Sequence, residues 1–316
     1  MHFGRISRNW MQTTWDTNEL EMETGLIRQY LHLHFIVVLL GFTAILGALI
    51  SIPAIELVWY RMLLAFAGLW VYFVWKKIPY RLSFKKQLHL YGIGLVVALH
   101  WIAFFQAINV SNVSVTLGVF ASATLFTAFL EPLLQKRRIL MLEVIVGLVI
   151  ILGIYIIFQY EFHYLEGIFY SLIAAFLNGL FAVLNRNISM RHHPTVISFY
   201  EMVGGFAFIT AFLLVSGGFG SGLPAVSGND LFYLLLLGFL CTSYAFTAIV
   251  HIMKKLSAYT VILAINLEPV YGILLALLFF PEAERMSGGF YLGTLIILAS
   301  VLSYPYLKRK FRKKLV

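Results

Sequence analysis

The chain has 316 residues, of which 61% are hydrophobic and only 12% are charged. An ordinary soluble domain is about 25% charged, so this chain has too little polar surface to coat a water-soluble globule. Its repeated apolar runs of bilayer length instead indicate an integral membrane protein, with the lipid bilayer as its main surrounding partner. The single cysteine, Cys241, cannot form an internal disulfide.

Residues 1–30 form a polar segment of mixed charge without an apolar period. The charged stretch is long and contains acidic as well as basic residues, and no small-residue cleavage site follows the first apolar run. These features do not fit a signal peptide. We therefore expect a disordered cytoplasmic extension at the N-terminus.

Ten apolar spans follow, each long enough to cross a hydrocarbon core of about 30 Å at 1.5 Å per residue. Their approximate ranges are 33–51, 55–75, 88–107, 113–134, 140–158, 166–186, 195–215, 230–251, 258–280 and 288–307. The connections are short, and several prolines fall at or between span ends, where they break helices cheaply. The pattern predicts an all-α integral membrane protein with ten transmembrane helices.

The basic residues are distributed unevenly between the two sides of these spans. All but two of the 23 Lys and Arg lie in the N-terminal segment, in loops after even-numbered spans, or in the C-terminal tail that ends with residues 311–316. Cationic side chains resist translocation, which predicts cytoplasmic termini and a multi-pass protein of the plasma (inner) membrane. These residues form a belt beside acidic headgroups, so the net charge of +9 does not indicate nucleic-acid binding.

The chain also resembles itself at an offset of 146 residues. The coinciding pairs are Ser111/Ser257, Val115/Val261, Leu117/Leu263, Gly147/Gly293, Ile150/Ile296, Ile151/Ile297, Leu152/Leu298 and Gly92/Gly238. We interpret residues 31–160 and 161–310 as two five-helix repeats. Because five is odd, the second repeat starts from the opposite membrane face. Such inverted repeats allow a midplane site to open alternately to either side.

Short motifs add to this layout. They are Leu267-Glu268-Pro269-Val270, Glu282-Ala283-Glu284-Arg285, Gly293-Thr294-Leu295-Ile296-Ile297-Leu298-Ala299 and Trp59-Tyr60-Arg61. Over residues 33–307 the chain resembles EamA-type members of the drug/metabolite transporter superfamily. It departs from them in the first half, where Ser122-Ala123-Thr124 replaces a frequent proline and Lys136-Arg137-Arg138 replaces a frequent acidic-Arg pair.

The resemblance implies a function and a location for the site. Members of the family mostly move amino acids or other small metabolites, often as exporters driven by a proton or substrate gradient. Their substrate cavity is lined by spans 1–4 and 6–9, with spans 5 and 10 at the periphery. The first-half departures leave the role of that loop open.

Polar groups inside the spans are the candidate site residues. A charge at the bilayer centre costs about 2.5–3.5 kcal/mol on insertion scales, so each one needs a reason. Glu268 lies about ten residues into the ninth span, near the midplane. It could cycle a proton or bind a substrate amine. Alternatively, it stays neutral and hydrogen-bonded to a neighbouring helix, with Pro269 as a fixed kink.

His100 and Asn178 reach a similar depth in spans 3 and 6. A histidine can relay protons near neutral pH, although a hydrogen-bonded core histidine is the alternative. Asn178 could bind a carboxylate or amide of the substrate, or it could join two helices by a hydrogen bond.

Arg61 and Glu201 each lie about six residues, roughly 9 Å, from the membrane face where their span begins, and the two faces are opposite. In a core of about 30 Å they should stand about 12 Å apart along the membrane normal. We therefore expect separate roles near two gates and no direct ion pair. Arg61 could attract an anionic group or snorkel to the outer surface.

Four tyrosines, Tyr60, Tyr200, Tyr244 and Tyr271, could line an amphipathic cavity, or they could simply face lipid or core. Metal and cofactor patterns are absent from the sequence. His32 and His34 are two apart and should point to different helix faces, while the sequence has no cysteine or carboxylate at metal-ligand spacing from His192 and His193. Without a Walker A or catalytic motif, we expect no cofactor and no enzyme activity.

The sequence thus favours a secondary transporter with a small-molecule substrate. The protein could act as a monomer or as a dimer. A membrane enzyme or a non-transporting scaffold is the alternative, but an enzyme should carry polar residues clustered at one membrane face. A channel would need more polar helix faces than these spans offer.

Overall fold

The computed structural model describes residues 6–136, 139–189, 193–220, 222–223, 225–253 and 264–313, and every regular element in them is a helix. The elements are α1 (Ile6–Leu49), α2 (Ala54–Lys76), α3 (Phe84–Val110), α4 (Val113–Phe120), α5 (Ala123–Gln135), α6 (Met141–Tyr160), η1 (Phe162–Tyr164), α7 (Leu165–Ser189), α8 (Pro194–Val215), α9 (Gly228–Leu235), η2 (Leu236–Tyr244), α10 (Ala245–Met253), α12 (Glu268–Phe279) and α13 (Gly288–Lys313). Of these, η1 is a 3-10 turn and η2 is a π-helix.

Eight helical stretches in the described residues are long and apolar enough to cross a membrane. They are Ile27–Leu49, Ala54–Lys76, Phe84–Val110, Val113–Gln135, Met141–Tyr160, Phe162–Asn185, Thr195–Val215 and Gly228–Ile249. Two further apolar helices, Glu268–Phe279 and Gly288–Tyr304, are shorter. The all-helical class is confirmed. The count of ten spans stays a prediction, since residues 258–263 of the expected ninth span lie outside the described residues.

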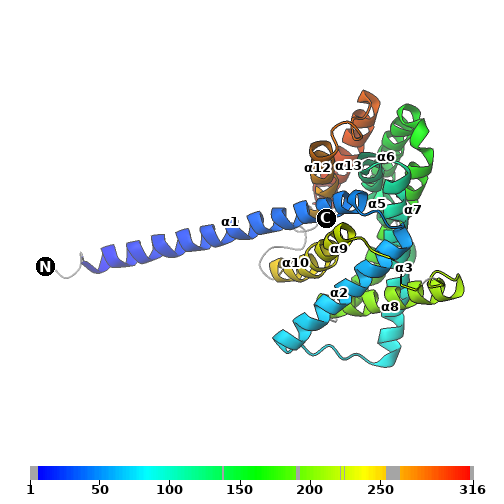
Figure 1. Cartoon of the computed structure of the whole chain (residues 1–316). Helices are drawn as coiled ribbons and strands as arrows, with labels where there is room; N and C mark the ends of the chain where they lie inside the picture. Colours follow the sequence, from blue (N-terminus) through cyan, green and yellow to red (C-terminus); the bar gives the residue numbers. More distant parts are fainter. Residues whose placement is uncertain are drawn as a thin grey trace.

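The first helix differs from the expectation. α1 begins at Ile6, within the segment 1–30 that we expected to be disordered, and Figure 1 shows it projecting far beyond the helical body. No proline interrupts residues 6–49. A helix nucleated by its packed part can therefore propagate outward, because each added residue costs far less than nucleation. The structure has a helix here in place of disorder.

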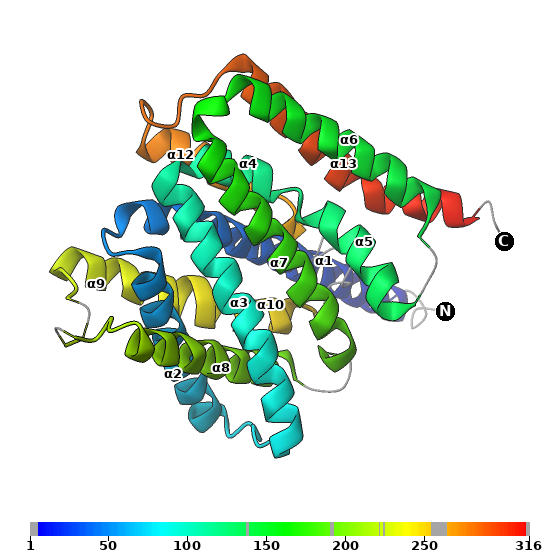
Figure 2. The same ribbon diagram turned by 90° about the vertical axis from the view of Figure 1, so that its right-hand side faces the viewer.

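The helices of the two expected halves pack in a matched way. α1 packs against α12, and its counterpart α7 packs against α4 and α5. α3 packs against α7 and α8, just as η2 packs against α1 and α2. Two corresponding helices, α6 and α13, lie side by side along one edge of the molecule (Figure 2). The pattern fits the expected pair of five-helix repeats, which stays a prediction, as does the opposite orientation of the halves in a membrane.

Both halves contain an interrupted helix at the same position of the repeat. α4 gives way to α5 around Ser122, and the helix at Ala264–Ile265 breaks before α12 begins at Glu268. The offset of 146 superposes Ser122 on Glu268. Pro269 has no N–H group, which accounts for the second break. The first break lacks a proline and is closed by a tight bond from the Ser122 nitrogen to the Val119 oxygen (3.0 Å).

A glycine supports each interrupted helix from a neighbouring helix. A Cβ on Gly41 of α1 would lie 2.8 Å from the backbone nitrogen of Gly272 and 3.2 Å from the carbonyl oxygen of Glu268. A Cβ on Gly179 of α7 would lie 3.3 Å from the carbonyl oxygen of Ala123. Small residues allow helix backbones to approach this closely in a membrane. The two glycines therefore set the positions at which α12 and α5 begin.

Candidate functional site

A cavity of about 260 Å³ lies at the centre of the helical body. Its described lining residues are Leu40, Thr43, Arg61, Val97, His100, Trp101, Phe104, Phe120, Asn178, Phe181, Glu201, Met202, Cys241, Phe246, Ile249, Ile265 and Glu268. They come from α1–α4, α7, α8, η2, α10 and the region around the start of α12. Within the described part of the chain, α6 and α13 contribute none. This is the division into lining and peripheral spans that the family resemblance implied.

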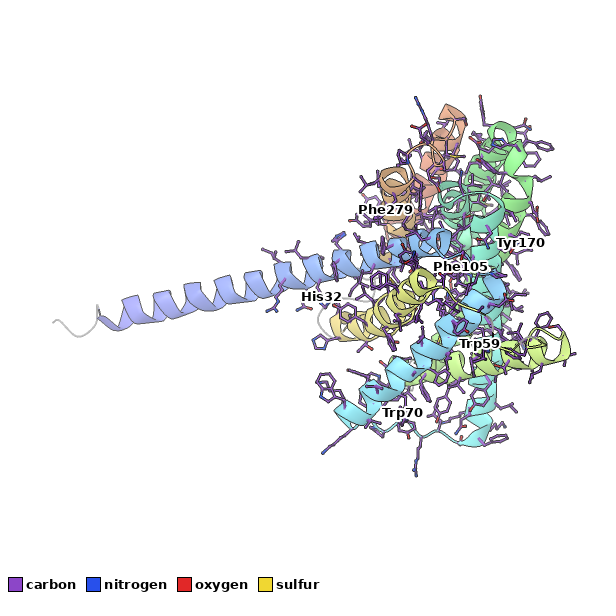
Figure 3. All side chains as sticks on the ribbon, in the orientation of Figure 1. His32, Trp59, Trp70, Phe105, Tyr170 and Phe279 are labelled. Atoms are coloured by element: carbon purple, nitrogen blue, oxygen red, sulfur yellow. The ribbon has the colours of Figure 1, made fainter. Side chains whose placement is uncertain are left out.

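Arg61 is the cation of this cavity and is only 4% exposed. Its guanidinium carbon lies 3.7 Å from the ring centroid of Trp101 and 5.6 Å from that of Phe105, which Figure 3 labels in the middle of the body. Its Nε donates a hydrogen bond to Thr242 Oγ1 (3.1 Å). A guanidinium has five N–H donors, so its outer nitrogens stay available for a partner in the cavity.

The π-helix η2 places the acceptor for Arg61. Thr242 Oγ1 donates to the carbonyl oxygen of Leu237 (2.8 Å), five residues earlier, which is a spacing that π-helices bring together. The neighbouring Ser243 Oγ donates to the carbonyl oxygen of Ala65 on α2 (3.0 Å). Single π-helical turns occur often at functional sites. Here the turn fastens η2 to α2 beside the buried guanidinium.

Glu201 brings a carboxylate into the same cavity from α8. It is 3% exposed and forms a side-chain hydrogen bond with Asn185 of α7. Its other oxygen, Oε1, is buried without a hydrogen-bond partner among the described residues. Buried polar atoms nearly always have partners, so an orphaned carboxylate oxygen at a cavity wall marks a place where a ligand donor would be stabilised.

Glu268 supplies a second carboxylate at the first residue of α12. It is partly buried and interacts electrostatically with Arg61. The positive end of a helix dipole favours a negative charge at this position. The break before α12 therefore turns a helix N-terminus and its carboxylate toward the centre of the protein.

His100 and Asn178 also line the cavity. His100 Nδ1 lies 2.8 Å from the carbonyl oxygen of Ala174 and must donate, because a carbonyl only accepts. In a neutral ring the other nitrogen, Nε2, is then an acceptor. The ring stacks on Phe120 at a centroid distance of 5.4 Å. His100 is thus held by the backbone of α7 while it faces the site.

Two of the tyrosine candidates lie outside the lining and belong to the seam between α1 and its neighbours. Tyr244 and His32 Nε2 are 2.8 Å apart, and Tyr271 and His34 Nδ1 are also 2.8 Å apart (Figure 3 labels His32 on α1). The two histidines reach different elements, as their spacing predicted. These tyrosine hydroxyls therefore join helices, and the prediction that they line the cavity is corrected.

The other two tyrosines are also absent from the described lining. Tyr200 is buried in a core cluster and contacts the Tyr91 ring at a centroid distance of 6.1 Å. Tyr60 meets Trp59 edge-on at 4.8 Å. Period and composition could not separate rings that face a cavity from rings that fill a core, because both kinds occupy the same helix faces.

The expected relation of Arg61 to Glu201 needs revision. We expected them near opposite gates, whereas both side chains line one cavity. The expectation treated each span as a straight rod along the membrane normal. The real helices cross at angles, and long side chains reach toward the centre from either direction. The described contacts of Arg61 include those with Thr242 and Trp101, and the absence of a direct ion pair with Glu201 stays a prediction.

Some site residues had no sequence signal. Cys241 and Thr43 are buried small polar residues in apolar runs, and the aromatic wall of Trp101, Phe104 and Phe181 resembles any lipid-facing stretch. Among the described residues no group of three or more His, Cys, Asp or Glu could hold a metal ion. His192, named above as an unpartnered histidine, lies outside the described residues.

Three carboxylates away from the cavity connect neighbouring loops and helix ends by hydrogen bonds that the sequence did not predict. Asp230 accepts hydrogen bonds from the nitrogen (2.8 Å) and the hydroxyl (2.7 Å) of Ser51. Glu161 accepts bonds from the nitrogen (3.1 Å) and the hydroxyl (2.6 Å) of Ser287. The sequence offers one signal for such a carboxylate, which is a serine at a helix start followed a few residues later by an acidic residue. Ser227 and Asp230 show this pattern at the start of α9.

Glu284 makes the third tie, at the N-terminus of α4. Its two oxygens accept hydrogen bonds from the backbone nitrogens of Val113 (2.9 Å) and Ser114 (2.8 Å). The Asn112 side chain caps the same helix and donates to the carbonyl oxygen of Ala283 (3.3 Å). The loop between α12 and α13 thus fixes the N-terminus of α4, and the last residue of α4, Phe120, lines the cavity.

Fold and site together define a class: a multi-pass, all-helical integral membrane protein with one central cavity that contains buried charges. Residues 165–304 match the model of the EamA-like transporter family. The match confirms the resemblance to EamA-type transporters over residues 165–304, slightly less than half of the chain. Transport as the family's role is consistent with the expectation that the chain is not an enzyme.

The fold is also found among solved structures. One described as "Crystal structure of protein" superposes with a TM-score of 0.62 at 16% sequence identity, covering 89% of this chain and 99% of the other. At that identity the likeness establishes the fold alone. No curated protein sequence matches the chain at a significant level.

Proposed function

We propose that the protein is a secondary transporter that exports small amine-bearing metabolites, amino acids among them, by alternating access through the central cavity and in exchange for protons. One observation carries the proposal: helices from both parts of the chain enclose one cavity that is lined by Arg61, Glu201 and Glu268. Buried charges in membrane spans are costly and are retained along substrate and proton pathways.

The ties between loops support an alternating mechanism. The positive-inside pattern assigns Asp230, Glu161 and Glu284 to the outer side, and each carboxylate there bonds to a neighbouring loop or helix start. We infer a state closed to the outside by these bonds. Opening toward the outside would exchange them for bonds to water.

The membrane orientation belongs to the same proposal. Both termini lie in the cytoplasm of a plasma (inner) membrane protein, and the two halves cross the bilayer in opposite senses. A membrane enzyme or a scaffold is the other candidate. The polar groups converge at the centre of the body, where a transported substrate would bind, and this favours the transporter.

Flux through the purified protein tests the proposal. Wild-type protein is reconstituted into liposomes, and uptake is measured for a panel of amino acids, amines and nucleosides with and without a pH gradient. Glu56→Gln, a carboxamide variant at the start of α2 outside the cavity, serves as the control. We expect gradient-sensitive flux of at least one compound in both proteins. No gradient-sensitive flux for any compound would contradict the transporter function.

A further inference from the structure

We infer that the cavity selects a monocationic amine with a flat apolar body, and that the ammonium group competes with a proton for Glu201. This inference rests on the proposed transport function and narrows its substrate class from amine-bearing metabolites in general, amino acids among them, to amines without a free carboxylate. Its starting point is a charge imbalance. Among the described lining residues, two carboxylates, Glu201 and Glu268, face one guanidinium, that of Arg61.

The guanidinium shares the cavity with the carboxylate of Glu268. Arg61 interacts electrostatically with Glu268, and its contacts with Thr242 and Trp101 hold it in place. A substrate carboxylate would have to compete with Glu268 for this cation in a site of low dielectric. Opposite charges so placed are strongly coupled, and an added anion there is penalised. The cavity therefore disfavours a substrate with a free carboxylate.

Among the described residues, Glu201 is the cavity carboxylate without a cation of its own. The other described titratable or charged side chains that line the cavity are Arg61 on α2, His100 on α3, Cys241 on η2 and Glu268 on α12, and Tyr91 and Tyr200 lie near Glu201 on α3 and α8. Of these, Arg61 is the permanent cation, and it interacts with Glu268. With Oε1 unpartnered and 3% of its surface exposed, Glu201 needs either a proton or a ligand cation.

The surroundings of Glu201 suit an ammonium group. An ammonium has three N–H donors and no acceptor. The cavity offers Glu201 Oε1, the Nε2 acceptor of His100 and the side-chain amide oxygen of Asn178. One face of Trp101 is taken by Arg61, so the remaining rings, such as Phe104 and Phe181, are left to an apolar substrate body. A volume of about 260 Å³ restricts that body to a small molecule.

Charge neutrality then links substrate and proton. With both carboxylates ionised, the three described charges sum to a net single negative charge. One proton on Glu201 neutralises this negative charge, and one bound ammonium group neutralises it equally well. Both together would leave a net positive charge in the cavity, so the proton and the ammonium exclude each other. Binding of the amine releases the proton from the Glu201 carboxyl to the solution, with no bond broken in the substrate. Exchange of one amine for one proton follows directly.

Equilibrium binding to the purified full chain in detergent tests this inference without interference from leak across membranes. Isothermal titration calorimetry is run between pH 5 and pH 8.5 with phenethylamine, which stays charged, and with L-phenylalanine, which differs by its carboxylate. We expect phenethylamine to bind at least tenfold more tightly. Its affinity should rise by up to tenfold per pH unit while Glu201 loses its proton, and then level off.

Matched variants separate the two carboxylates. Glu201→Gln should weaken phenethylamine binding at least tenfold and remove its pH dependence, whereas Glu201→Asp keeps a carboxylate and should keep the pH dependence even if its stability falls. Glu268→Gln frees Arg61 and should shift the preference toward phenylalanine. Glu56→Gln should match the wild type.

Several outcomes would overturn the inference: phenylalanine binding as tightly as phenethylamine, pH-independent amine binding, unchanged binding in Glu201→Gln, or no binding of phenethylamine. These results are distinct from failure of the proposed function. Gradient-sensitive flux of other compounds in liposomes would leave the transporter in place while the substrate class is rejected.

Discussion

The guanidinium carbon of Arg61 lies over the ring of Trp101, 3.7 Å from the ring centroid, and both side chains line the central cavity. The contact joins α2 to α3 through a cation–π interaction in a desolvated site, where such contacts are worth about 2 kcal/mol. Together with the bond to Thr242, it fixes the direction of the cation. The buried charge is therefore a positioned group, and its shape matters as much as its sign.

Replacing Arg61 by lysine tests that statement. Arg61→Lys keeps the charge but loses the planar fork, the stacking on Trp101 and the Nε donor to Thr242. We expect at least a tenfold fall in kcat/KM for transport in liposomes, with normal insertion. Arg28→Lys, in the exposed part of α1, is the matched control and should transport as the wild type does. Equal activity in the two variants would reject a positioned Arg61.

Glu268→Gln addresses proton coupling. The variant removes a negative charge at the start of α12 but keeps the size of the side chain, so the protein should still insert. Without that charge Arg61 loses its counter-ion, and the cavity no longer favours a cation or proton. We expect pH-driven accumulation of substrate to disappear. Accumulation at the wild-type level in liposomes with an imposed pH gradient would eliminate this role.

The tie between Glu284 and α4 predicts a stability effect. Glu284→Ala leaves the backbone N–H groups of Val113 and Ser114 without their acceptors. Charge-assisted bonds of this kind contribute about 2 kcal/mol, so the melting temperature should fall by several degrees. Glu282→Ala, at an exposed position in the same loop, should leave it unchanged. Fluorescence-monitored unfolding in detergent gives the comparison, and equal melting temperatures would refute the tie.

The crossing of α1 and α12 gives a prediction of opposite sign at two glycines. A methyl group at Gly41 would meet the backbone of α12 at 2.8 Å, whereas one at Gly92 would meet nothing within 4 Å. Gly41→Ala should therefore destabilise the protein by about 1–3 kcal/mol. Gly92→Ala should stabilise it by up to about 1 kcal/mol, because alanine favours a helix. The same unfolding assay measures both, and a stabilised Gly41→Ala would contradict the close crossing.

Much of the site was readable from sequence because charge is rare inside apolar spans. Arg61, Glu201, Glu268, His100 and Asn178 each stood out against long apolar runs, and the structure brings all five to one cavity. The distribution of Lys and Arg and the resemblance to EamA-type proteins predicted the class. The break at Glu268 was predictable from Pro269, which lacks an N–H group.

Other features depend on tertiary contacts that no local pattern encodes. The π-helix η2 has no turn-forming residue apart from Gly238, and its role became clear only from the bond of Arg61 to Thr242. Tyr244 and Tyr271 looked like cavity residues until their hydroxyls were found beside His32 and His34. The helix at the N-terminus was not predicted because residues 1–30 lack an apolar period. A helix can nevertheless extend outward from a packed segment without such a period.

The account depends on two halves that cross the bilayer in opposite senses and share one cavity. Corresponding starting points of the halves are Arg28, before the first span, and Phe162, before the sixth, and both are exposed. With the native Cys241 changed to serine, a single cysteine is placed at each position and treated with a membrane-impermeant maleimide. We predict that Phe162→Cys reacts on intact cells and Arg28→Cys reacts only after permeabilisation. Reaction of both from the same side would contradict the opposed halves and the shared cavity built from them.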